Sequence, residues 1–166
     1  MYFKQLNSFI FVIVFLWSCD HWLKPIDEPD IIKYTGLSGT IHYKNWPPQD
    51  SVLLLKLVVF KKYPPVNIVS EVLAGSAVTY PEELAEGLPY QADSTEFELQ
   101  LEAGHYEYIS VAQQYGNNIF ADWRVVGQYD ITLQDTIPTA VTVAPDSMVS
   151  GINIFVDFDS LPPQPF

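Results

Sequence analysis

The chain has 166 residues and a formal net charge of −12, with ten tyrosines, ten phenylalanines, four tryptophans and thirteen prolines. This length indicates one domain, and aromatic residues spaced by prolines favour strands separated by turns. The acidic charge argues against partners that require a basic surface, namely nucleic acids and anionic lipid headgroups.

The N-terminal residues have the parts of a secretory signal peptide. Lys4 supplies a positive charge, and an apolar run follows from Phe9 to Trp17. This run of nine residues is too short to span a bilayer, which takes about 20, but it suits the apolar part of a signal peptide. Cys19 follows this part and is the only cysteine, so no intramolecular disulfide can form.

The residues Leu16-Trp17-Ser18-Cys19 resemble a bacterial lipobox, although Trp17 is bulkier than the residues usual at that position. The resemblance implies that residues 1–18 are a lipoprotein signal peptide, that the Cys19 sulfur carries diacylglycerol, and that the new amine is acylated after cleavage. A cysteine thiolate is nucleophilic enough for this thioether, and several acyl chains give a stable anchor. The alternatives are a secreted protein with an unused cysteine and an uncleaved anchor. Asp20 leaves the choice between inner and outer membrane open.

Residues 19–36 are expected to form the lipidated cysteine and a tether. This segment contains Pro25, Pro29 and four acidic residues without a periodic pattern. Such a tether would hold a folded domain, expected over 37–160, away from the membrane. A proline-rich tail follows over 161–166.

Two strands are predicted at the start of the domain. Ser38–Trp46 alternates Gly39, Ile41 and Tyr43 with polar residues, which is the period of a strand with one buried face. Ser51–Lys62 is the strongest apolar run of the domain. A run this continuous indicates a central strand buried on both faces. A helix is the alternative, which the β-branched residues and the flanking prolines disfavour.

The next segment has weaker signals. Ile68–Leu73 is predicted as a short strand. Thr79 and Glu82 have the spacing of a helix capping box, and Gly87 suits the residue that follows a helix. One short helix is therefore predicted over Pro81–Glu86.

A β-hairpin is predicted over Glu96–Ala112. Apolar and polar residues alternate strictly in its first half, and Ala103-Gly104 would form a tight turn in which Gly104 takes positive φ. A two-residue loop would pair Glu102 with His105, Leu101 with Tyr106 and Leu99 with Tyr108. This register would place Leu99, Leu101, Tyr106 and Tyr108 together on the core face.

Three further strands are predicted, over Ile119–Tyr129, Thr139–Val143 and Val149–Phe158. The last one turns four apolar residues to the same face, Ile152, Ile154, Val156 and Phe158. The chain therefore has about seven or eight short strands and at most one short helix. This pattern is typical of an all-β fold, an antiparallel two-sheet sandwich, with a closed barrel as the alternative.

Two short motifs resemble the carboxypeptidase regulatory-like group. They are Gly39-Thr40-Ile41 at the start of the first strand and the stretch Leu101-Glu102-Ala103-Gly104-His105-Tyr106. The resemblance covers about Leu37 to Ala112 and implies a transthyretin-like (prealbumin-like) sandwich of about seven strands. Members of this group are mostly non-catalytic accessory modules. The segment from Ala112 to Val149 is longer than the group needs.

No motif for catalysis or for a cofactor is present in the sequence. The three histidines, His21, His42 and His105, are widely separated, and no Gly-x-Ser-x-Gly elbow occurs. Zinc would require His or Cys pairs at short spacing, and none exists. We therefore expect no enzyme, no metal site and no cofactor.

Calcium is a separate case, because it binds scattered oxygen atoms. Asp157 and Asp159 share a face of the last predicted strand and would need Asp130 or Asp135 as further ligands. The interpretation that we favour is a solvated acidic edge, which discourages association between sheets.

Aromatic residues at predicted strand ends and loops offer a binding platform. Trp46, Tyr115 and Trp123 are the candidates for stacking on sugar rings. The competing interpretation is that such residues cap the ends of the core.

The sequence therefore predicts a lipid-anchored protein of the bacterial cell envelope, with its domain outside the cytoplasm. Its function would be non-catalytic, as an interaction or structural module that engages another envelope protein. The alternative is a module that binds a glycan or another small ligand through aromatic residues at one end of the sandwich.

Overall fold

The computed structural model of the protein describes residues 34–83, 85–132 and 137–165. The predicted signal peptide, Cys19 and most of the predicted tether lie outside these residues, as does Asp135. Within the described ranges, no helix combines the length and the apolar character that crossing a bilayer would take.

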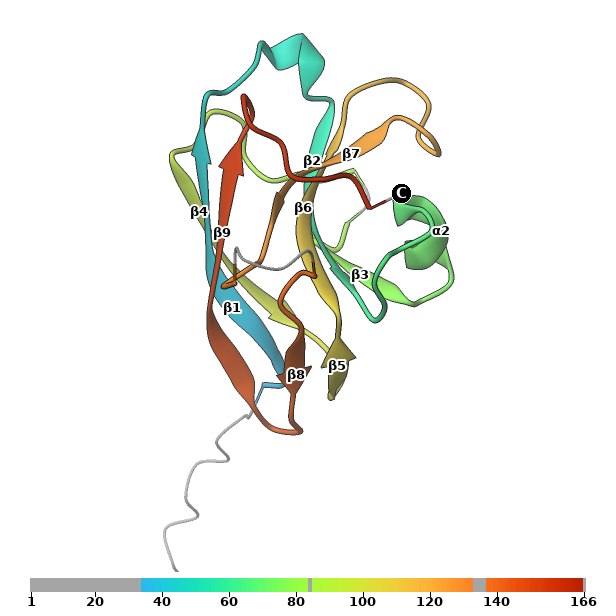
Figure 1. The fold of residues 1–166 in the computed structure, drawn as a ribbon, viewed down its shortest axis with the longest axis vertical. Coiled ribbons are helices and arrows are strands. Elements are labelled where there is room, and N and C mark those ends of the chain that lie inside the picture. Colours follow the sequence, from blue (N-terminus) through green and yellow to red (C-terminus); the bar gives the residue numbers. More distant parts are fainter. Residues whose placement is uncertain (1–33, 84, 133–136, 166) are drawn as a thin grey trace, which may run out of the picture. The chain divides into compact units, whose positions relative to one another are not determined.

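Nine strands form the described part of the chain, together with one short α-helix and one 3₁₀ turn. Seven of the strands make one sheet in the order β3-β2-β6-β7-β9-β1-β4, and β5 pairs with β8 in a small second sheet (Figure 1). The prediction of an all-β fold is confirmed, with more strands than expected. The elements are β1 (Gly36–Lys44), η2 (Gln49–Ser51), β2 (Leu54–Phe60), α2 (Ile68–Leu73), β3 (Ala77–Tyr80), β4 (Ser94–Gln100), β5 (Gly104–Tyr106), β6 (Tyr108–Gln114), β7 (Trp123–Gln128), β8 (Val141–Val143) and β9 (Met148–Asp157).

The large sheet is mixed, so the prediction of a purely antiparallel fold is wrong. β9 runs antiparallel to β7 but parallel to β1, with Ile41 opposite Ile154. The alternation of buried and exposed residues is the same in parallel and antiparallel strands. The sequence pattern therefore identifies the buried face of β9 but not the direction of its neighbour.

The large sheet curls so that its two halves share one core. Buried residues of β1, β4 and β9 belong to the same cluster as buried residues of β2 and β6. Tyr80 on β3 and Phe97 on β4 lie at opposite ends of the strand order, yet their ring centroids are 6.2 Å apart. Between β7 and β9 only two residue pairs form, Gly127 with Val156 and Gln128 with Phe155. This short pairing is the seam between the two halves.

The predicted central strand is confirmed as β2, which lies between β3 and β6. One of its faces places Leu55, Leu57 and Val59 in the main core. The other face places Val58 and Phe60 in a second cluster, which α2 covers. Burial on both faces explains why the apolar run is nearly continuous.

The strand predicted over Ile68–Leu73 is instead the helix α2. Asn67 caps its first turn, because the Asn67 side-chain oxygen accepts hydrogen bonds from the amides of Val69 and Ser70 at 3.0 and 3.2 Å. Only Ile68 of this helix is buried. The asparagine cap outweighs the β-branched residues that suggested a strand.

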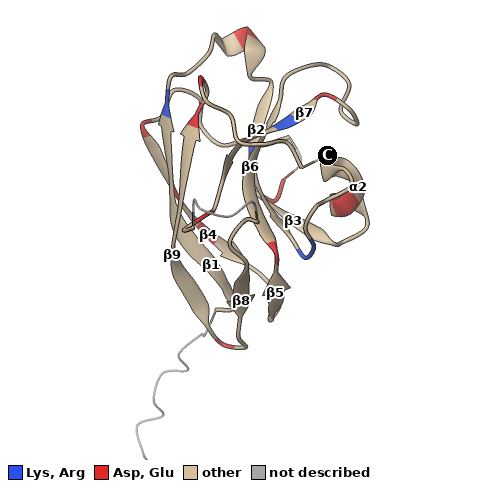
Figure 2. Cartoon of the chain, in the orientation of Figure 1, with Lys and Arg blue, Asp and Glu red and all other residues tan. Residues whose placement is uncertain are grey.

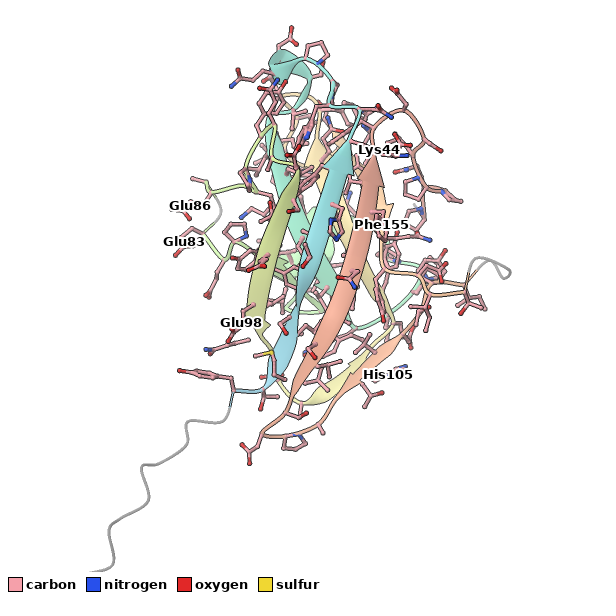
Figure 3. All side chains as sticks on the ribbon, turned by 90° about the vertical axis from the view of Figure 1, so that its left-hand side faces the viewer. Lys44, Glu83, Glu86, Glu98, His105 and Phe155 are labelled. Atoms are coloured by element: carbon pink, nitrogen blue, oxygen red, sulfur yellow. The ribbon has the colours of Figure 1, made fainter. Side chains whose placement is uncertain are left out.

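A helix is predicted over Pro81–Glu86, but the described residues of this segment form bends and a turn. Lys56 is buried, and its ammonium donates hydrogen bonds to the carbonyls of Pro81 and Glu83 at 2.8 and 2.6 Å. Burial lowers the pKa of Lys56, against the opposing effect of Glu83 and Glu86. These two carboxylates lie on the loop that covers the lysine (Figure 3). The Glu83 carbonyl also accepts from the Glu86 amide at 3.1 Å, so the segment forms a single turn over the lysine and not a helix.

The predicted hairpin is also wrong in its pairing. β4 pairs with β1, whereas β6 pairs with β2 and β7, so the chain crosses from one half of the sheet to the other through β5. Gly104 lies in β5 and has no positive φ. The four residues are buried as predicted, but they do not lie together on one core face. Leu99, Leu101 and Tyr106 lie in the main core, and Tyr108 lies in the second cluster.

The remaining predicted strands are confirmed as β1, β7, β8 and β9. Ile152, Ile154 and Val156 of β9 are buried in the main core, and Phe158 packs against it. The C-terminal tail crosses back to β7. Its Gln164 side chain binds the backbone of Val125.

Candidate binding site beside strand β7

The structure brings together two of the three predicted aromatic site residues. Tyr115 and Trp123 line one pocket beside the loop of residues 115–122, which joins β6 to β7. Trp46 lies elsewhere and caps the main core. Its indole N–H donates to the carbonyl of Ala92 at 2.9 Å, and its ring packs on Tyr43, Tyr90 and Phe158.

The loop of residues 115–122 is tied by hydrogen bonds across its base. The amide of Tyr115 donates to the carbonyl of Asp122 at 3.0 Å, and the Asp122 carboxylate accepts from the amide of Asn118 at 2.8 Å. The Trp123 indole N–H donates to the carbonyl of Ile119 at 2.8 Å, which holds its ring against the loop. The two aromatic walls of the pocket are therefore positioned by the backbone.

Three segments distant in the sequence meet at this pocket, which has a volume of about 450 Å³. The Asn67 side-chain amide at the start of α2 donates to the carbonyl of Phe120 at 3.1 Å. The C-terminal tail contributes Gln164, and Figure 1 shows the C-terminal end next to α2. The lining residues are Asn67, Tyr115, Ala121, Trp123, Arg124 and Gln164.

Arg124 is the feature of this pocket that the sequence interpretation missed. It is the only arginine in the chain. Its Nε donates to the side-chain oxygen of Gln113 at 3.0 Å, and its guanidinium carbon lies 5.6 Å from the ring centroid of Tyr115. A guanidinium this close to the centre of an aromatic ring makes a cation–π contact. The feature of the sequence that could have identified Arg124 is that it is a single arginine in a strongly acidic chain.

Arg124 forms no ion pair with any described carboxylate. Among the described lysines, Lys44 pairs with Asp157 at 3.1 Å and Lys61 pairs with Glu102 at 3.7 Å, whereas Lys56 binds backbone carbonyls. Figure 2 shows how few basic residues accompany the acidic residues along the chain. The Arg124 guanidinium is therefore a positive charge that no described carboxylate neutralises in an ion pair.

Exposed apolar side chains occur in two of the segments that line the pocket. Val66, Ile119 and Phe120 are 80, 55 and 59% exposed, and Tyr115 is 45% exposed. The hydrogen bond from Asn67 to Phe120 keeps the start of α2 and the β6–β7 loop together. We call these four residues, Val66, Tyr115, Ile119 and Phe120, the apolar rim.

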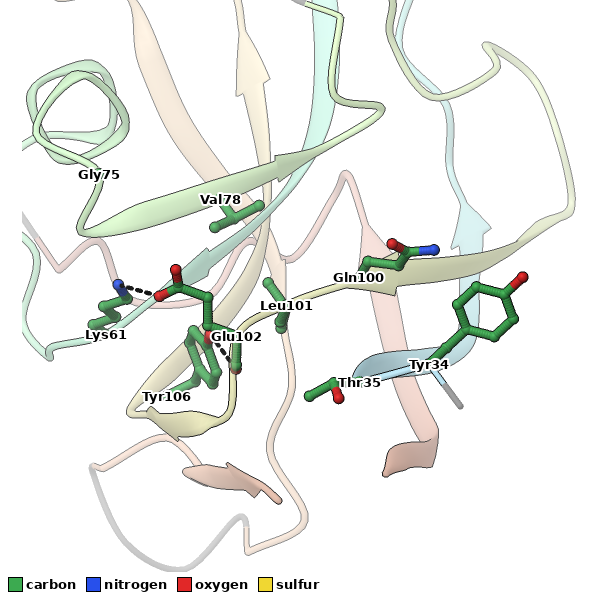
Figure 4. Close-up of a pocket in the computed structure, with 9 residues that line it drawn as sticks. All are labelled: Tyr34, Thr35, Lys61, Gly75, Val78, Gln100, Leu101, Glu102 and Tyr106. Atoms are coloured by element: carbon green, nitrogen blue, oxygen red, sulfur yellow. Dashed lines mark hydrogen bonds and ion pairs between the residues drawn. The ribbon is translucent and has the colours of Figure 1, made fainter. Parts of the chain in front are cut away.

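A second pocket, of about 520 Å³, lies where the ends of β2 and β4 approach each other. Figure 4 shows its polar side, where Lys61 forms an ion pair with Glu102 and the Tyr106 hydroxyl donates to the Glu102 carbonyl at 2.9 Å. Burial, with a smaller contribution from the Glu102 charge, raises the pKa of Tyr106. The cation that lines this pocket is thus already paired within the protein.

The outer face of β4, β1 and β9 is exposed and carries one large apolar residue. Phe155 is 72% exposed and stacks on His42, with ring centroids 5.1 Å apart. Figure 3 shows Phe155 projecting from this face and Glu98 on the neighbouring edge strand. Isolated exposed apolar residues of this kind are common on protein surfaces.

Two of the aspartates that were considered as calcium ligands are engaged in other contacts. Asp157 accepts a hydrogen bond from the side-chain amide of Asn45 at 2.8 Å and pairs with Lys44, and these two contacts lower its pKa. Asp130 accepts hydrogen bonds from the Thr132 amide and the Thr139 hydroxyl. Among the described residues, no three His, Cys, Asp or Glu side chains are grouped closely enough to hold a metal ion.

Comparisons of the chain with models of protein families, with curated proteins and with solved structures found no significant match.

Proposed function

We propose that the protein is a lipid-anchored, non-catalytic component of the bacterial cell envelope, whose β domain binds another envelope protein through the apolar rim. The observation that carries this proposal is the exposure of Val66, Ile119 and Phe120 in two segments, the start of α2 and the β6–β7 loop, that the hydrogen bond from Asn67 to Phe120 joins. Clustered exposed apolar residues mark interaction surfaces, because their removal from water contributes about 25 cal/mol per Å².

The sequence supports the location and the class of partner. The lipobox resemblance at Leu16 to Cys19 directs the domain to the outside of the cytoplasm. A net charge of −12 disfavours nucleic acid and anionic lipid as the surface that the rim contacts. A protein partner with an apolar surface and a basic border fits both properties.

Site-specific photo-crosslinking in intact cells tests this proposal. A photoreactive residue at position 120 should give one dominant crosslinked envelope protein, identified by mass spectrometry. The matched control carries the same photoreactive residue at position 155, because Phe155 is exposed on a different face. The change Ile119→Ser should abolish the crosslink from position 120. Identical products from both positions, or a product with the mass of two copies of this chain, would contradict the proposal.

A second candidate function is the binding of a glycan or another small ligand. The observation that favours it is that Tyr115 and Trp123 line the same pocket. A glycan screen should then show binding that is lost in Tyr115→Ala and kept in Phe155→Ala, a change to an exposed aromatic residue outside the pocket. Equal binding by both variants would contradict this function.

The fold itself supports a more specific family assignment, which belongs to the same proposal. We infer a transthyretin-like two-sheet sandwich, in which β3, β2, β6 and β7 face β9, β1 and β4. The shared core of the two halves and the contact between Tyr80 and Phe97 support this arrangement. Such sandwiches use the loops at their ends for binding, and the β6–β7 loop is one of these.

A further inference from the structure

The pocket beside β7 contains a positive charge that the described protein does not neutralise. Arg124 has one hydrogen-bond partner, Gln113, and one ring partner, Tyr115, and its terminal nitrogens bind no described residue. A guanidinium presents five N–H donors in a planar fork that matches a carboxylate in two parallel hydrogen bonds. With Nε occupied by Gln113, the edge that carries the two terminal nitrogens remains available.

Gln113 holds the guanidinium in place. Its side chain is fully buried, and its amide nitrogen donates to the carbonyl of Ser51 at 2.6 Å. This bond leaves the Gln113 side-chain oxygen directed at Nε of Arg124. An arginine that is oriented in advance loses little side-chain entropy when an anion binds.

The rest of the pocket combines two aromatic rings with side-chain amides that are already hydrogen-bonded. The side chains of Asn67 and Gln164 line the pocket, but their amide groups already bind backbone atoms of Phe120 and Val125. The remaining walls include the rings of Tyr115 and Trp123. A ligand would therefore combine one carboxylate with a ring that can lie against an aromatic face.

We propose that this pocket binds an acidic sugar of the uronic acid class, with its carboxylate held by the terminal nitrogens of Arg124 and its ring against the aromatic wall. The pocket volume of about 450 Å³ accommodates one sugar ring. This inference rests on the second candidate function and deepens it. Tyr115 belongs to both the pocket and the apolar rim, so the variants that test the inference change Arg124 and leave the rim intact. It assigns Arg124 as the residue that selects an acidic ligand over a neutral one.

Titrations followed by nuclear magnetic resonance test this assignment on the ¹⁵N-labelled full chain. The probes are sodium galacturonate, galactose and sodium acetate, at matched concentration and ionic strength. Galacturonate should shift the Nε–H signal of Arg124 and the amides of residues 115–124, whereas galactose should bind at least about 10-fold more weakly, because charge-assisted hydrogen bonds contribute about 1.5–3 kcal/mol. Equal shifts with galactose would overturn the role of the carboxylate, and equally tight binding of acetate would overturn the role of the sugar ring.

Two variants separate the arginine from general charge effects. Arg124→Gln should weaken galacturonate binding by about 10-fold or more, and Arg124→Lys should restore only part of it, since lysine lacks the planar fork. Lys62→Gln removes the same charge from an exposed position outside the pocket and should leave binding unchanged. Unchanged binding by Arg124→Gln would refute the site. The crosslink from position 120 reports on protein docking separately, so one proposal can fail without the other.

Discussion

Gly39 on β1 lies directly against the backbone of Ile152 on β9. A β-carbon added to Gly39 would lie 1.9 Å from the Ile152 carbonyl oxygen and 2.6 Å from its carbonyl carbon. The contact occurs where the parallel pairing of β1 and β9 shifts its register, between Leu37 and Gly39. Backbone atoms cannot move aside as a flexible side chain can, so only glycine fits this position.

We expect Gly39→Ala to destabilise the domain by about 2 kcal/mol or more, because the added methyl group must separate β1 from β9. Urea unfolding measures the change as a lower midpoint. Gly104→Ala is the matched control, since the nearest atom to its added β-carbon is a Tyr106 ring carbon at 3.8 Å. Equal midpoints for the two variants would show that the close approach of β1 and β9 is unimportant for stability.

Tyr43 is expected to make the domain sensitive to alkaline pH. Burial raises its pKa to about 12, whereas an unfolded tyrosine ionises near pH 10. The folded state therefore keeps a proton that the unfolded state releases. The contribution of Tyr43 to the unfolding free energy is fully present below pH 10. It is lost as the pH rises toward 12 and amounts to about 2–3 kcal/mol.

The change Tyr43→Phe should reduce this loss between pH 10 and 12. At pH 7 it should change the unfolding free energy little, because the Tyr43 hydroxyl is buried and the Thr95 hydroxyl that faces it is too poorly aligned for a regular hydrogen bond. Tyr108→Phe is the comparison. Its hydroxyl donates to the Gln128 side chain at 3.2 Å, and its loss should cost about 0.5–1.5 kcal/mol at pH 7. Urea titrations at each pH measure this difference. If the Tyr43→Phe variant lost as much unfolding free energy at alkaline pH as the unchanged protein, the assignment to Tyr43 would be wrong.

Gln164 is expected to protect the edge of β7 where β9 no longer pairs with it. Its side-chain oxygen accepts from the Val125 amide at 2.8 Å, and its side-chain nitrogen donates to the Val125 carbonyl at 2.9 Å. Gln164→Ala leaves both groups unpaired beside the seam, at a cost of about 1–3 kcal/mol. Hydrogen exchange of the Val125 amide should accelerate by about 10-fold or more.

Gln164→Glu refines this test, because glutamate keeps an acceptor for the Val125 amide but loses the donor to its carbonyl. The Val125 amide should then stay more protected than in Gln164→Ala. If neither variant changed the hydrogen exchange of the Val125 amide, the tail would not pair with β7 in solution.

Cys19 is expected to anchor the protein to a membrane. Cys19→Ala should block lipidation and processing, so the protein should leave the membrane fraction or accumulate with its signal peptide. Ser18→Ala retains the cysteine and a small residue before it, and should behave like the unchanged protein. Cell fractionation and intact mass spectrometry give both readouts. If Cys19→Ala changed neither the membrane attachment nor the mass of the protein, the lipid anchor would be ruled out.

Local patterns in the sequence predicted which residues of the domain are buried. The period of two in Phe97, Leu99 and Leu101 places these residues in the core, as the structure confirms. The continuous apolar run of β2 likewise indicated burial on both faces. These predictions succeed because the alternation of side chains along a strand is a property of the strand itself.

Pairing partners and the candidate site were decided by tertiary structure. The predicted hairpin fails because the backbone of β4 pairs with β1, which lies far away in the sequence, and no local pattern identifies a distant partner. Trp46 caps the core rather than joining Tyr115 and Trp123, since position at a strand end does not say which end of the fold a residue occupies. Arg124 became a candidate site residue only when folding placed it over Tyr115 and against the buried Gln113, without an ion pair to any described carboxylate. The sequence alone determines which side chains leave water, because burial follows short-range periodicity. The long-range pairing of backbones determines which of those side chains meet.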